Sequence, residues 1–310
     1  MANQEISERL TDVSDFVRWG ANRFERAGLH FGHGTDNAAD EAAFLVASAL
    51  GIDHECLATQ AGRELTGLEK ETVGELFHRR IHERRPAAYL ASETWFAGLR
   101  FHVDERVLIP RSPIAELINE RFEPWVDPEK VYRILDLCTG SGCIGIACGH
   151  AFPDATVDCT DISQDALAVA TLNIAQHGLA ERVRVVRSDL FAELGRNRYD
   201  LIVSNPPYVG EASLDTLPVE YSYEPRLGLA AGADGLDVVR ELLARAAEHL
   251  SPHGVLVCEV GESAEALEQA FPHVPFVWLD FTRGGDGVFV LGAEELARTS
   301  VAARRIRDAG

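Results

Sequence analysis

The sequence predicts an α/β protein in which a doubly wound, mostly parallel sheet follows a small helical domain. From Arg133 onward, short apolar runs typical of strands alternate with helical stretches. This alternation is the pattern of a parallel sheet covered by helices on both faces. A glycine-rich loop follows the first run, the position at which such sheets bind ligands. Before about residue 85, apolar residues recur at helical spacings and no β-branched run interrupts them.

Residues 1–90 form the expected helical domain. The stretch from Gly28 to Thr35 predicts a loop between helices, and Glu69 to Arg85 predicts a charged helix that Pro86 ends. The apolar residues that define the helical spacing are Phe16, Trp19, Phe24, Leu45, Leu50, Leu65, Leu76 and Phe77.

Residues 91–112 are expected to connect the two domains. Aromatic and apolar residues flank the pair Ala97-Gly98, which predicts a β-hairpin over Thr94 to Val103. The segment from Val107 to Pro113 then leads into a helix expected near Ile114 to Phe122.

Residues 113–293 form the expected sheet domain, and residues 294–310 a C-terminal tail. A helix is expected from Ser163, as its cap, to Gln176. The last two apolar runs, 276–281 and 288–291, are joined by a glycine turn and predict a terminal antiparallel pair. This pair completes a seven-stranded sheet, whose other strands are expected at 134–137, 156–159, 183–186, 201–203 and 255–258.

Composition and charge narrow the range of functions. The chain has 310 residues, 46% of them hydrophobic, and a formal net charge of −20, so we expect two domains with a sizeable core. Such acidity disfavours a large face for duplex DNA, which needs clustered Lys and Arg. It permits a basic protein as partner, although acidity also serves simply to keep a protein in solution.

The sequence predicts neither a metal site nor a membrane span. Its six cysteines form no C-x-x-C pair and lie mostly in apolar runs, which indicates reduced, buried thiols. The first residues lack the basic and apolar regions of a signal peptide. No apolar stretch approaches the roughly 20 residues of a membrane span. We therefore expect a soluble, cytoplasmic protein without a metal.

The stretch Asn205-Pro206-Pro207-Tyr208 carries the most information about function. It follows a strand-like run that ends at Ser204. Two prolines cannot continue a sheet ladder, and the residue before a proline is held extended. The motif therefore places an amide, a proline carbonyl and an aromatic ring at the sheet edge where ligands bind. A rigid loop that merely ends the strand would explain the prolines but neither Asn205 nor Tyr208.

The loop after the first predicted strand indicates a nucleoside cofactor. Gly140, Gly142 and Gly145 satisfy the pattern G-x-G-x-x-G, a weak signal that serves nicotinamide cofactors equally well. Glycines let the backbone pass close under a ligand, and the helix N-terminus that follows favours negative groups.

Three aspartates narrow the choice of cofactor. Asp161 ends the second predicted strand and can accept hydrogen bonds from ribose hydroxyls, and Asp189 ends the third and can accept from an adenine amino group. Leu190 can pack on the adenine ring. Taken singly, each aspartate is better explained as a solvated strand end or a helix cap. Together with Asp136 they disfavour a pyrophosphate and favour S-adenosylmethionine, which carries a sulfonium and an ammonium group.

The stretch Asn205-Pro206-Pro207-Tyr208 suggests a chemistry in which a group is transferred to a planar –NH₂ group. The side-chain oxygen of Asn205 and the carbonyl of Pro206 can accept both hydrogens of an amide, which orients the nitrogen lone pair and stabilises its growing positive charge. Tyr208 can stack on the amide plane. An adenine amino group poses the same problem, so the motif alone does not separate protein from nucleic acid as the acceptor.

These residues together resemble the class I, Rossmann-like methyltransferases of the protein N5-glutamine family, and the order of the domains matches over nearly the whole chain. The resemblance implies S-adenosylmethionine as methyl donor, S-adenosylhomocysteine as product, and substrate recognition by the helical domain. It implies catalytic roles for Asn205, Pro206, Pro207 and Tyr208. It implies cofactor contacts at Asp136, Cys138, Thr139, Gly140, Ser141, Gly142, Asp161, Ile162, Asp189, Leu190 and Asn205.

Two branches of this family compete. The release-factor enzymes usually carry R-P-E-T-E after the connector, whereas Pro110-Arg111-Ser112-Pro113 resembles the branch that methylates large-subunit ribosomal protein uL3. The stretches 135–144, 224–230 and 284–289 resemble that branch too. Leu190 stands where the release-factor enzymes often carry an aromatic residue. Arg111 is expected to steady the connector or to reach the cofactor carboxylate, and a structural salt bridge is equally plausible.

We therefore expect methyl transfer to a glutamine of ribosomal protein uL3, whose basic character suits an acidic enzyme. Four other functions remain open: methylation of a release factor, methylation of adenine N6 in a nucleic acid, a nicotinamide-dependent dehydrogenase built on the glycine loop, and a binding module without catalysis.

Overall fold

The computed structural model describes residues 10–282 and 284–299, and the chain divides into two compact units. The smaller unit comprises Met1–Thr94, Val103–Glu105 and Pro218–Tyr223. The larger unit comprises Trp95–His102, Arg106–Leu217 and Glu224–Gly310. Residues 218–223, which the sequence analysis places within the sheet domain, therefore group with the helical part of the chain.

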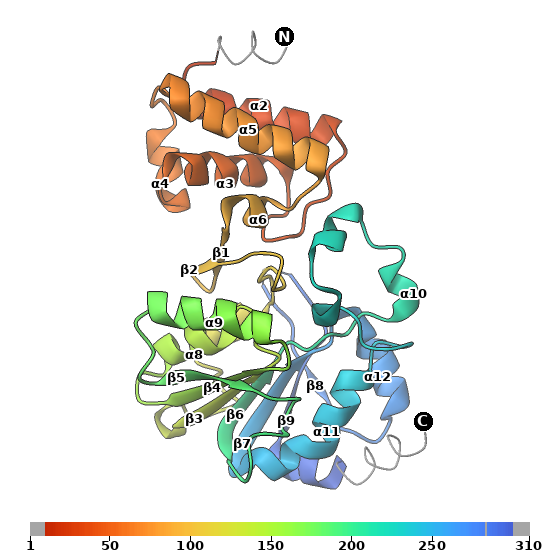
Figure 1. Ribbon diagram of the computed structural model, residues 1–310. Helices are drawn as coiled ribbons and strands as arrows, with labels where there is room; N and C mark the ends of the chain where they lie inside the picture. Colours follow the sequence, from red (N-terminus) through yellow and green to blue (C-terminus); the bar gives the residue numbers. More distant parts are fainter. Residues whose placement is uncertain (1–9, 283, 300–310) are drawn as a thin grey trace. The chain divides into compact units, whose positions relative to one another are not determined.

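The described residues of the smaller unit are mostly helical, as predicted (Figure 1). Side chains cap the three long helices: Asp12 caps α2, Asn37 caps α3 and Thr66 caps α5. Thr66 and Glu69 form a reciprocal capping box, which satisfies two N–H groups at the start of the helix. The helices are α2 (Val13–Arg26), α3 (Ala38–Leu50), α4 (His54–Leu57), α5 (Gly67–Glu83) and α6 (Ala87–Ala91).

A buried ion cluster holds residues 218–223 within the smaller unit. Arg80 and Glu220 are both fully buried, and Arg80 lies 2.7 Å from Glu41 and 3.4 Å from Glu220. Arg84 lies 2.8 Å from Glu220, and the His30 N–H donates to the same carboxylate at 3.0 Å. These contacts join positions up to 190 residues apart in sequence, which explains why the sequence pattern did not reveal them.

The predicted hairpin is confirmed as β1 (Glu93–Phe96) and β2 (Leu99–His102). Ala97 and Gly98, which join the two strands, have φ angles of 49° and 76°. Positive φ at both central residues is what a tight two-residue hairpin turn requires.

The larger unit contains a seven-stranded sheet of order β5-β4-β3-β6-β7-β9-β8 (Figure 1). Strands β5, β4, β3, β6 and β7 are mutually parallel, and β9 runs antiparallel to β7 and β8. The predicted sheet and its terminal antiparallel pair are therefore confirmed. The strands are β3 (Arg133–Leu137), β4 (Thr156–Asp161), β5 (Val183–Arg187), β6 (Tyr199–Ser204), β7 (Leu250–Glu259), β8 (Val277–Trp278) and β9 (Val288–Gly292).

Successive strand residues serve two separate cores. Ile134 packs in the core that contains residues of α7 (Ile114–Asn119), α8 (Cys143–Ala151) and α9 (Gln164–Gln176). Its neighbour Leu135 packs in the core that contains residues of α11 (Asp237–His249) and α12 (Ala264–Ala270). Because successive side chains of a strand point to opposite faces of the sheet, these two cores show that helices cover both faces. The short helix α10 (Glu211–Leu214) follows β6, and residues 293–299 are helical.

The sheet positions a ligand site where its strand order reverses. Strand β3 lies between β4 and β6, so the connections after β3 and β6 diverge at the carboxyl edge. Open α/β sheets bind ligands in the crevice that this divergence opens.

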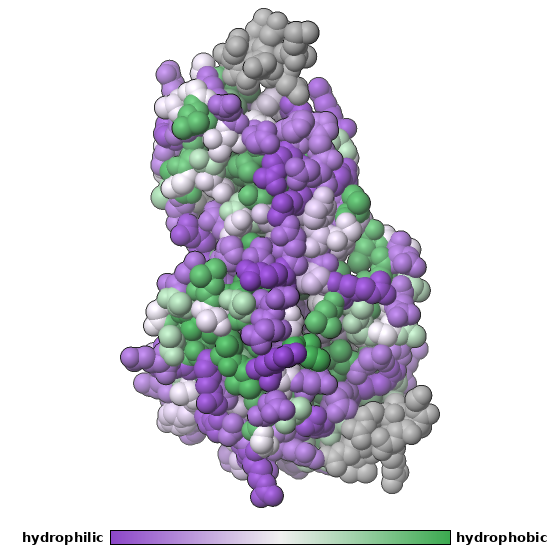
Figure 2. All heavy atoms as spheres, viewed as in Figure 1, coloured by the Kyte–Doolittle hydropathy of each residue, from purple (hydrophilic) through white to green (hydrophobic). Residues whose placement is uncertain are grey.

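Hydrophilic side chains predominate on the visible faces, with small hydrophobic groups between them (Figure 2). Within the described ranges, no helix is both long and apolar enough to cross a membrane.

Candidate active site

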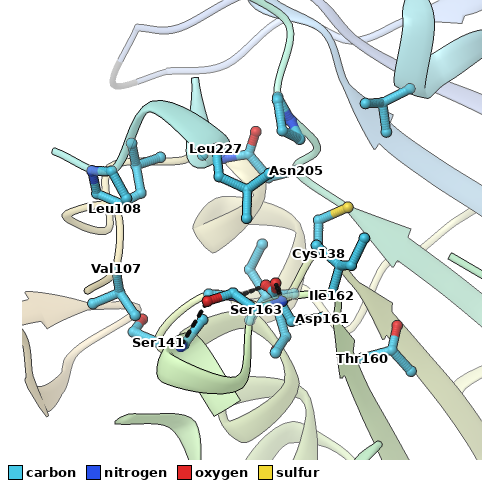
Figure 3. A pocket seen from close by; sticks show the side chains of 18 of the residues that line it. Val107, Leu108, Cys138, Ser141, Thr160, Asp161, Ile162, Ser163, Asn205 and Leu227 are labelled. Carbon is cyan, nitrogen blue, oxygen red and sulfur yellow. Dashed lines mark hydrogen bonds between the residues drawn. The ribbon is translucent and has the colours of Figure 1, made fainter. Parts of the chain in front are cut away.

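A pocket of about 350 Å³ lies in the larger unit, within the size range of small-molecule sites. The loops after β3, β4, β5 and β6 contribute to its lining, together with residues 106–112, residues 225–230 and the start of α11. Figure 3 shows Asp161 and Ser163 on one side of it, and Asn205 and Leu227 on the other. Of the predicted site residues, Arg111, Cys138, Thr139, Gly140, Ser141, Asp161, Ile162, Asp189, Leu190, Asn205 and Pro207 line this pocket.

Among the described residues, four predicted site residues do not line this pocket, although each lies within two positions of a lining residue in the sequence. They are Asp136, Gly142, Pro206 and Tyr208. Asp136 is buried beneath the glycine loop, where its Oδ2 accepts from the Thr139 hydroxyl and from the Gly145 N–H at 2.9 Å. Its Oδ1 has no hydrogen-bond partner among the described residues. Burial raises the pKa of Asp136 to about 7.

The glycine loop turns sharply under the pocket. Cys138, Gly140 and Gly142 have φ angles of 59°, 55° and 82°, and a non-glycine residue in this region is characteristic of a functional loop. Gly142 caps α8, and its N–H donates to the Thr139 carbonyl at 2.9 Å. Burial raises the pKa of the Cys138 thiol, so this pocket residue is a neutral thiol at physiological pH.

Asp161 joins the end of β4 to the glycine loop. One carboxylate oxygen accepts from the Gly140 N–H at 3.0 Å and the other from the Ser163 N–H at 2.9 Å (Figure 3). Burial raises the pKa of this carboxyl, although the backbone hydrogen bonds oppose the shift. Each oxygen keeps a further lone pair, so the carboxylate can still accept from a ligand in the pocket.

Asn173 on α9 is a loop-positioning residue that the sequence analysis missed. Its buried amide donates to the Ser141 carbonyl at 2.9 Å and exchanges hydrogen bonds with the backbone of His102 at 2.8 and 3.0 Å. This one side chain therefore fixes the glycine loop against the end of β2. An asparagine in a helix gives no sequence signal for such a role.

The apolar wall of the pocket comes from separate segments. Ile162, with 46% of its surface exposed, and Leu190, at a φ of 46°, follow β4 and β5. The Ser188 hydroxyl donates to the Leu190 carbonyl at 2.7 Å and holds that turn. Val107, Leu108 and Leu227 supply further apolar lining (Figure 3), which the sequence analysis did not single out.

Arg111 forms a two-pronged ion pair with buried Glu224. Its two terminal nitrogens lie 2.6 and 2.8 Å from the two carboxylate oxygens, and Glu224 also accepts from the Ile109 N–H at 3.0 Å. The salt bridge that the sequence left open is thus present, and the arginine lines the pocket at the same time.

Asn205 presents an unengaged amide to the pocket. It follows β6, whose last residue, Ser204, donates its hydroxyl to the Leu137 carbonyl at 2.9 Å. Across the described residues, neither the Asn205 amide nor the Pro206 carbonyl takes part in a hydrogen bond. The Asn205 amide in the pocket lining and the carbonyl of Pro206, the next residue in the chain, therefore both remain able to accept hydrogen bonds.

Fold and site together define a class I methyltransferase. The methyltransferase small domain model matches residues 122–219, and the PrmC N-terminal domain model matches residues 15–91. Among solved structures, the hMettl16 catalytic domain aligns with a TM-score of 0.50 at 17% identity, over 74% of this chain and 84% of that one. This likeness concerns the fold alone.

Curated relatives identify the family. Proteins named ribosomal protein uL3 glutamine methyltransferase are 47% identical in Francisella tularensis and 52% identical in Xanthomonas campestris. The first match covers 95% of this chain and 94% of the relative, and the second covers 94% of each. One from Neisseria meningitidis serogroup B is 49% identical over 96% of this chain and 97% of its own length. The chain belongs to the ribosomal protein uL3 glutamine methyltransferase family.

Proposed function

We propose that this protein transfers a methyl group from S-adenosylmethionine to the side-chain amide nitrogen of a glutamine in ribosomal protein uL3. The observation that carries this proposal is that the Asn205 amide, which lines the pocket, and the carbonyl of the adjacent Pro206 make no hydrogen bond among the described residues. An amide –NH₂ group has two hydrogens to donate, and two fixed acceptors are what its recognition requires.

The pocket suits a cofactor that carries positive charge. Its charged lining consists of four carboxylates and two guanidinium groups, and one of these guanidiniums is already paired with Glu224. Asp161 would accept from the ribose hydroxyls and Asp189 from the adenine amino group, with Ile162 and Leu190 against the ring. The carboxylates of the lining are Asp161, Asp189, Asp237 and Glu241.

When bound, S-adenosylmethionine supplies an electrophilic methyl group. Asn205 and Pro206 would accept the two amide hydrogens of the glutamine and thereby aim the nitrogen lone pair at that methyl. The same acceptors stabilise the positive charge that develops on nitrogen. Addition of the methyl group leaves a positive charge on the amide nitrogen, and this cationic amide is acidic and releases one N–H proton to solvent, so the site needs no strong base.

The family favours uL3 as the protein substrate over a release factor. The formal net charge of the chain, −20 at pH 7, favours a basic substrate such as a ribosomal protein. It disfavours adenine methylation in duplex DNA, which would require a basic face. We place the reaction in the cytoplasm, where ribosomal proteins are made, and assign it no membrane partner.

A competition assay tests this function. Equal amounts of free uL3 and of a release factor are incubated with the enzyme and with S-adenosylmethionine labelled in the methyl group. We expect label on uL3, located on one glutamine by mass spectrometry. Label on the release factor would transfer the protein to the other branch, and label only in added nucleic acid would refute glutamine as the acceptor. Calorimetry should show binding of S-adenosylmethionine and none of NAD.

A further inference from the structure

Glu259, the last residue of β7, has a carboxylate that is almost fully buried in the larger unit. Its Oε1 accepts from the Tyr208 hydroxyl at 3.0 Å, and its Oε2 accepts from the Ser112 hydroxyl at 2.5 Å. A buried carboxylate is costly unless such partners satisfy it. No step of the reaction described above uses this group.

The two hydroxyls belong to two separate segments that contribute to the pocket lining. Ser112 lines the pocket and closes the segment that begins at Arg106, and Tyr208 ends the stretch in which Asn205 and Pro207 line it. We propose that Glu259 is a positioning residue that clamps these two segments together and so holds the Pro206 carbonyl and the Asn205 amide in place for the glutamine. This inference rests on the proposed function.

Tyr208 is held at three further points. A Cβ on Gly261 would lie 2.6 Å from the Tyr208 ring, so glycine there allows the backbone to pack directly on the ring. The Ser263 hydroxyl donates to the Tyr208 carbonyl at 2.7 Å. A Cβ on Gly235 would lie 2.3 Å from the same carbonyl oxygen. The Tyr208 carbonyl and ring are thus both held in place, and the Tyr208 hydroxyl donates to Glu259.

The rigidity of the motif transmits this restraint. Prolines fix φ at two successive positions, so an anchored Tyr208 leaves little freedom to the carbonyl of Pro206, two residues earlier. Displacing a positioning group by about 1 Å can cost about 10²-fold in rate. Burial is the largest influence on the pKa of Glu259 and raises it, and the hydrogen bonds from Ser112 and Tyr208 lower it. The charged groups around this carboxylate are Arg111, which lowers its pKa, and Asp286, which raises it.

The test is a double-mutant cycle in the full-length enzyme with Glu259→Ala, Tyr208→Phe and the combination of both. We expect each single change to lower kcat on the order of 10- to 100-fold. The combination should cost no more than the worse single change, because both remove one interaction. The dissociation constant of S-adenosylmethionine, from calorimetry, should stay within about threefold. Glu259→Gln, which keeps one acceptor and the shape, should recover most of the lost rate.

A matched control is Glu268→Gln on α12, where the carboxylate accepts from the Trp278 Nε1 at 2.6 Å away from the pocket. Its kcat should equal that of the unmodified enzyme. Two results would overturn the clamp. The first is a double variant whose kcat falls by the product of the two single losses. The second is a kcat of Glu259→Ala within about twofold of the unmodified enzyme.

Hydrogen exchange separates the clamp from the proposed function, since it needs no substrate. The Val209 N–H, next to Tyr208, donates to the Leu229 carbonyl at 2.8 Å. Glu259→Ala should speed exchange of this amide at least about tenfold in the folded protein, and unchanged exchange there would refute the clamp. Absence of uL3 methylation by the unmodified enzyme, in contrast, would refute the function and leave the exchange result standing.

Discussion

Asn205 owes its position in the site to the two prolines that come after it. These prolines end the strand, so the amide stands at the edge of the pocket without an internal hydrogen bond. Replacing Asn205 by Ala should lower kcat by on the order of 10²-fold or more, since one of two oriented acceptors is lost. Methyl transfer to uL3 under saturating cofactor measures this. A kcat within about fivefold of the unmodified enzyme would contradict the assigned role.

A second prediction at the residue scale concerns Asp136. Its folded-state pKa is raised from 3.8 to about 7 by burial. The folded state therefore binds more protons than the unfolded state between these values, and this contribution to stability is lost as the pH rises through about 7. The loss is at most about 1.4 kcal/mol per pH unit. The amide of Asp136→Asn does not titrate, so this variant does not show this loss of stability.

Urea denaturation at pH 5.5, 7 and 8.5 measures the effect. Relative to the unmodified protein, the free energy of unfolding of Asp136→Asn should rise from pH 5.5 to 7 and then level off. A difference between the two proteins that is independent of pH would show that Asp136 is ionised throughout.

Residues with a local signature could be predicted from sequence, and residues that act through long-range contacts could not. Asn205 precedes two prolines at the end of one strand, Asp161 ends another strand just before a helix cap, and both line the pocket. Glu259 ends an apolar strand just as a solvated residue would, and only its contacts with Tyr208 and Ser112 reveal its position.

At the scale of elements, helix α8 packs closely on strands β3 and β4 because Gly145 has no side chain. A Cβ on Gly145 would lie 2.3 Å from the Cys159 Sγ and 3.0 Å from the Asp136 Oδ2. Gly145→Ala should therefore destabilise the protein by about 1–3 kcal/mol through overpacking. The control is Gly74→Ala inside α5, where no atom lies within 4 Å of the added Cβ; it should stabilise by about 0.5–1 kcal/mol. Thermal unfolding of both variants checks these opposite signs.

The elements themselves were largely predictable. Short apolar runs and glycine turns predicted the seven strands and the hairpin, and the structure confirms a mostly parallel, seven-stranded sheet. The boundaries of two elements differ from the prediction because the pattern of apolar residues does not mark them. Strand β7 begins at Leu250, five residues before the predicted run, and α7 ends at Asn119 rather than near Phe122.

At the scale of the whole molecule, residues 218–223 belong to the smaller unit, although the chain around them belongs to the larger one. The ion cluster around Arg80 holds them there. Arg80→Met would leave the buried Glu41 without its arginine and Glu220 with Arg84 as its remaining ion-pair partner, and breaking a buried pair in this way costs about 3–5 kcal/mol. The neighbouring Arg79→Met, which removes a half-exposed pair with Glu83, should cost less than about 1 kcal/mol. Helix unfolding by circular dichroism in urea compares the two, and equal costs would contradict the cluster's role.

The acidity of the whole chain leads to a prediction about the substrate. If charge attraction steers a basic ribosomal protein, KM for uL3 should rise as the salt concentration increases from about 50 to about 300 mM, because screening shortens the reach of surface charges. The dissociation constant of S-adenosylmethionine should change little. A KM insensitive to salt would show that the net charge has no part in substrate capture.

The most direct test of the account is a crystal structure of the enzyme with S-adenosylhomocysteine and a glutamine-containing peptide of uL3. We predict the glutamine amide nitrogen within hydrogen-bond distance, about 2.7–3.2 Å, of both the Asn205 side-chain oxygen and the Pro206 carbonyl, facing the cofactor sulfur. A glutamine bound elsewhere, or one whose amide contacts neither acceptor, would contradict it.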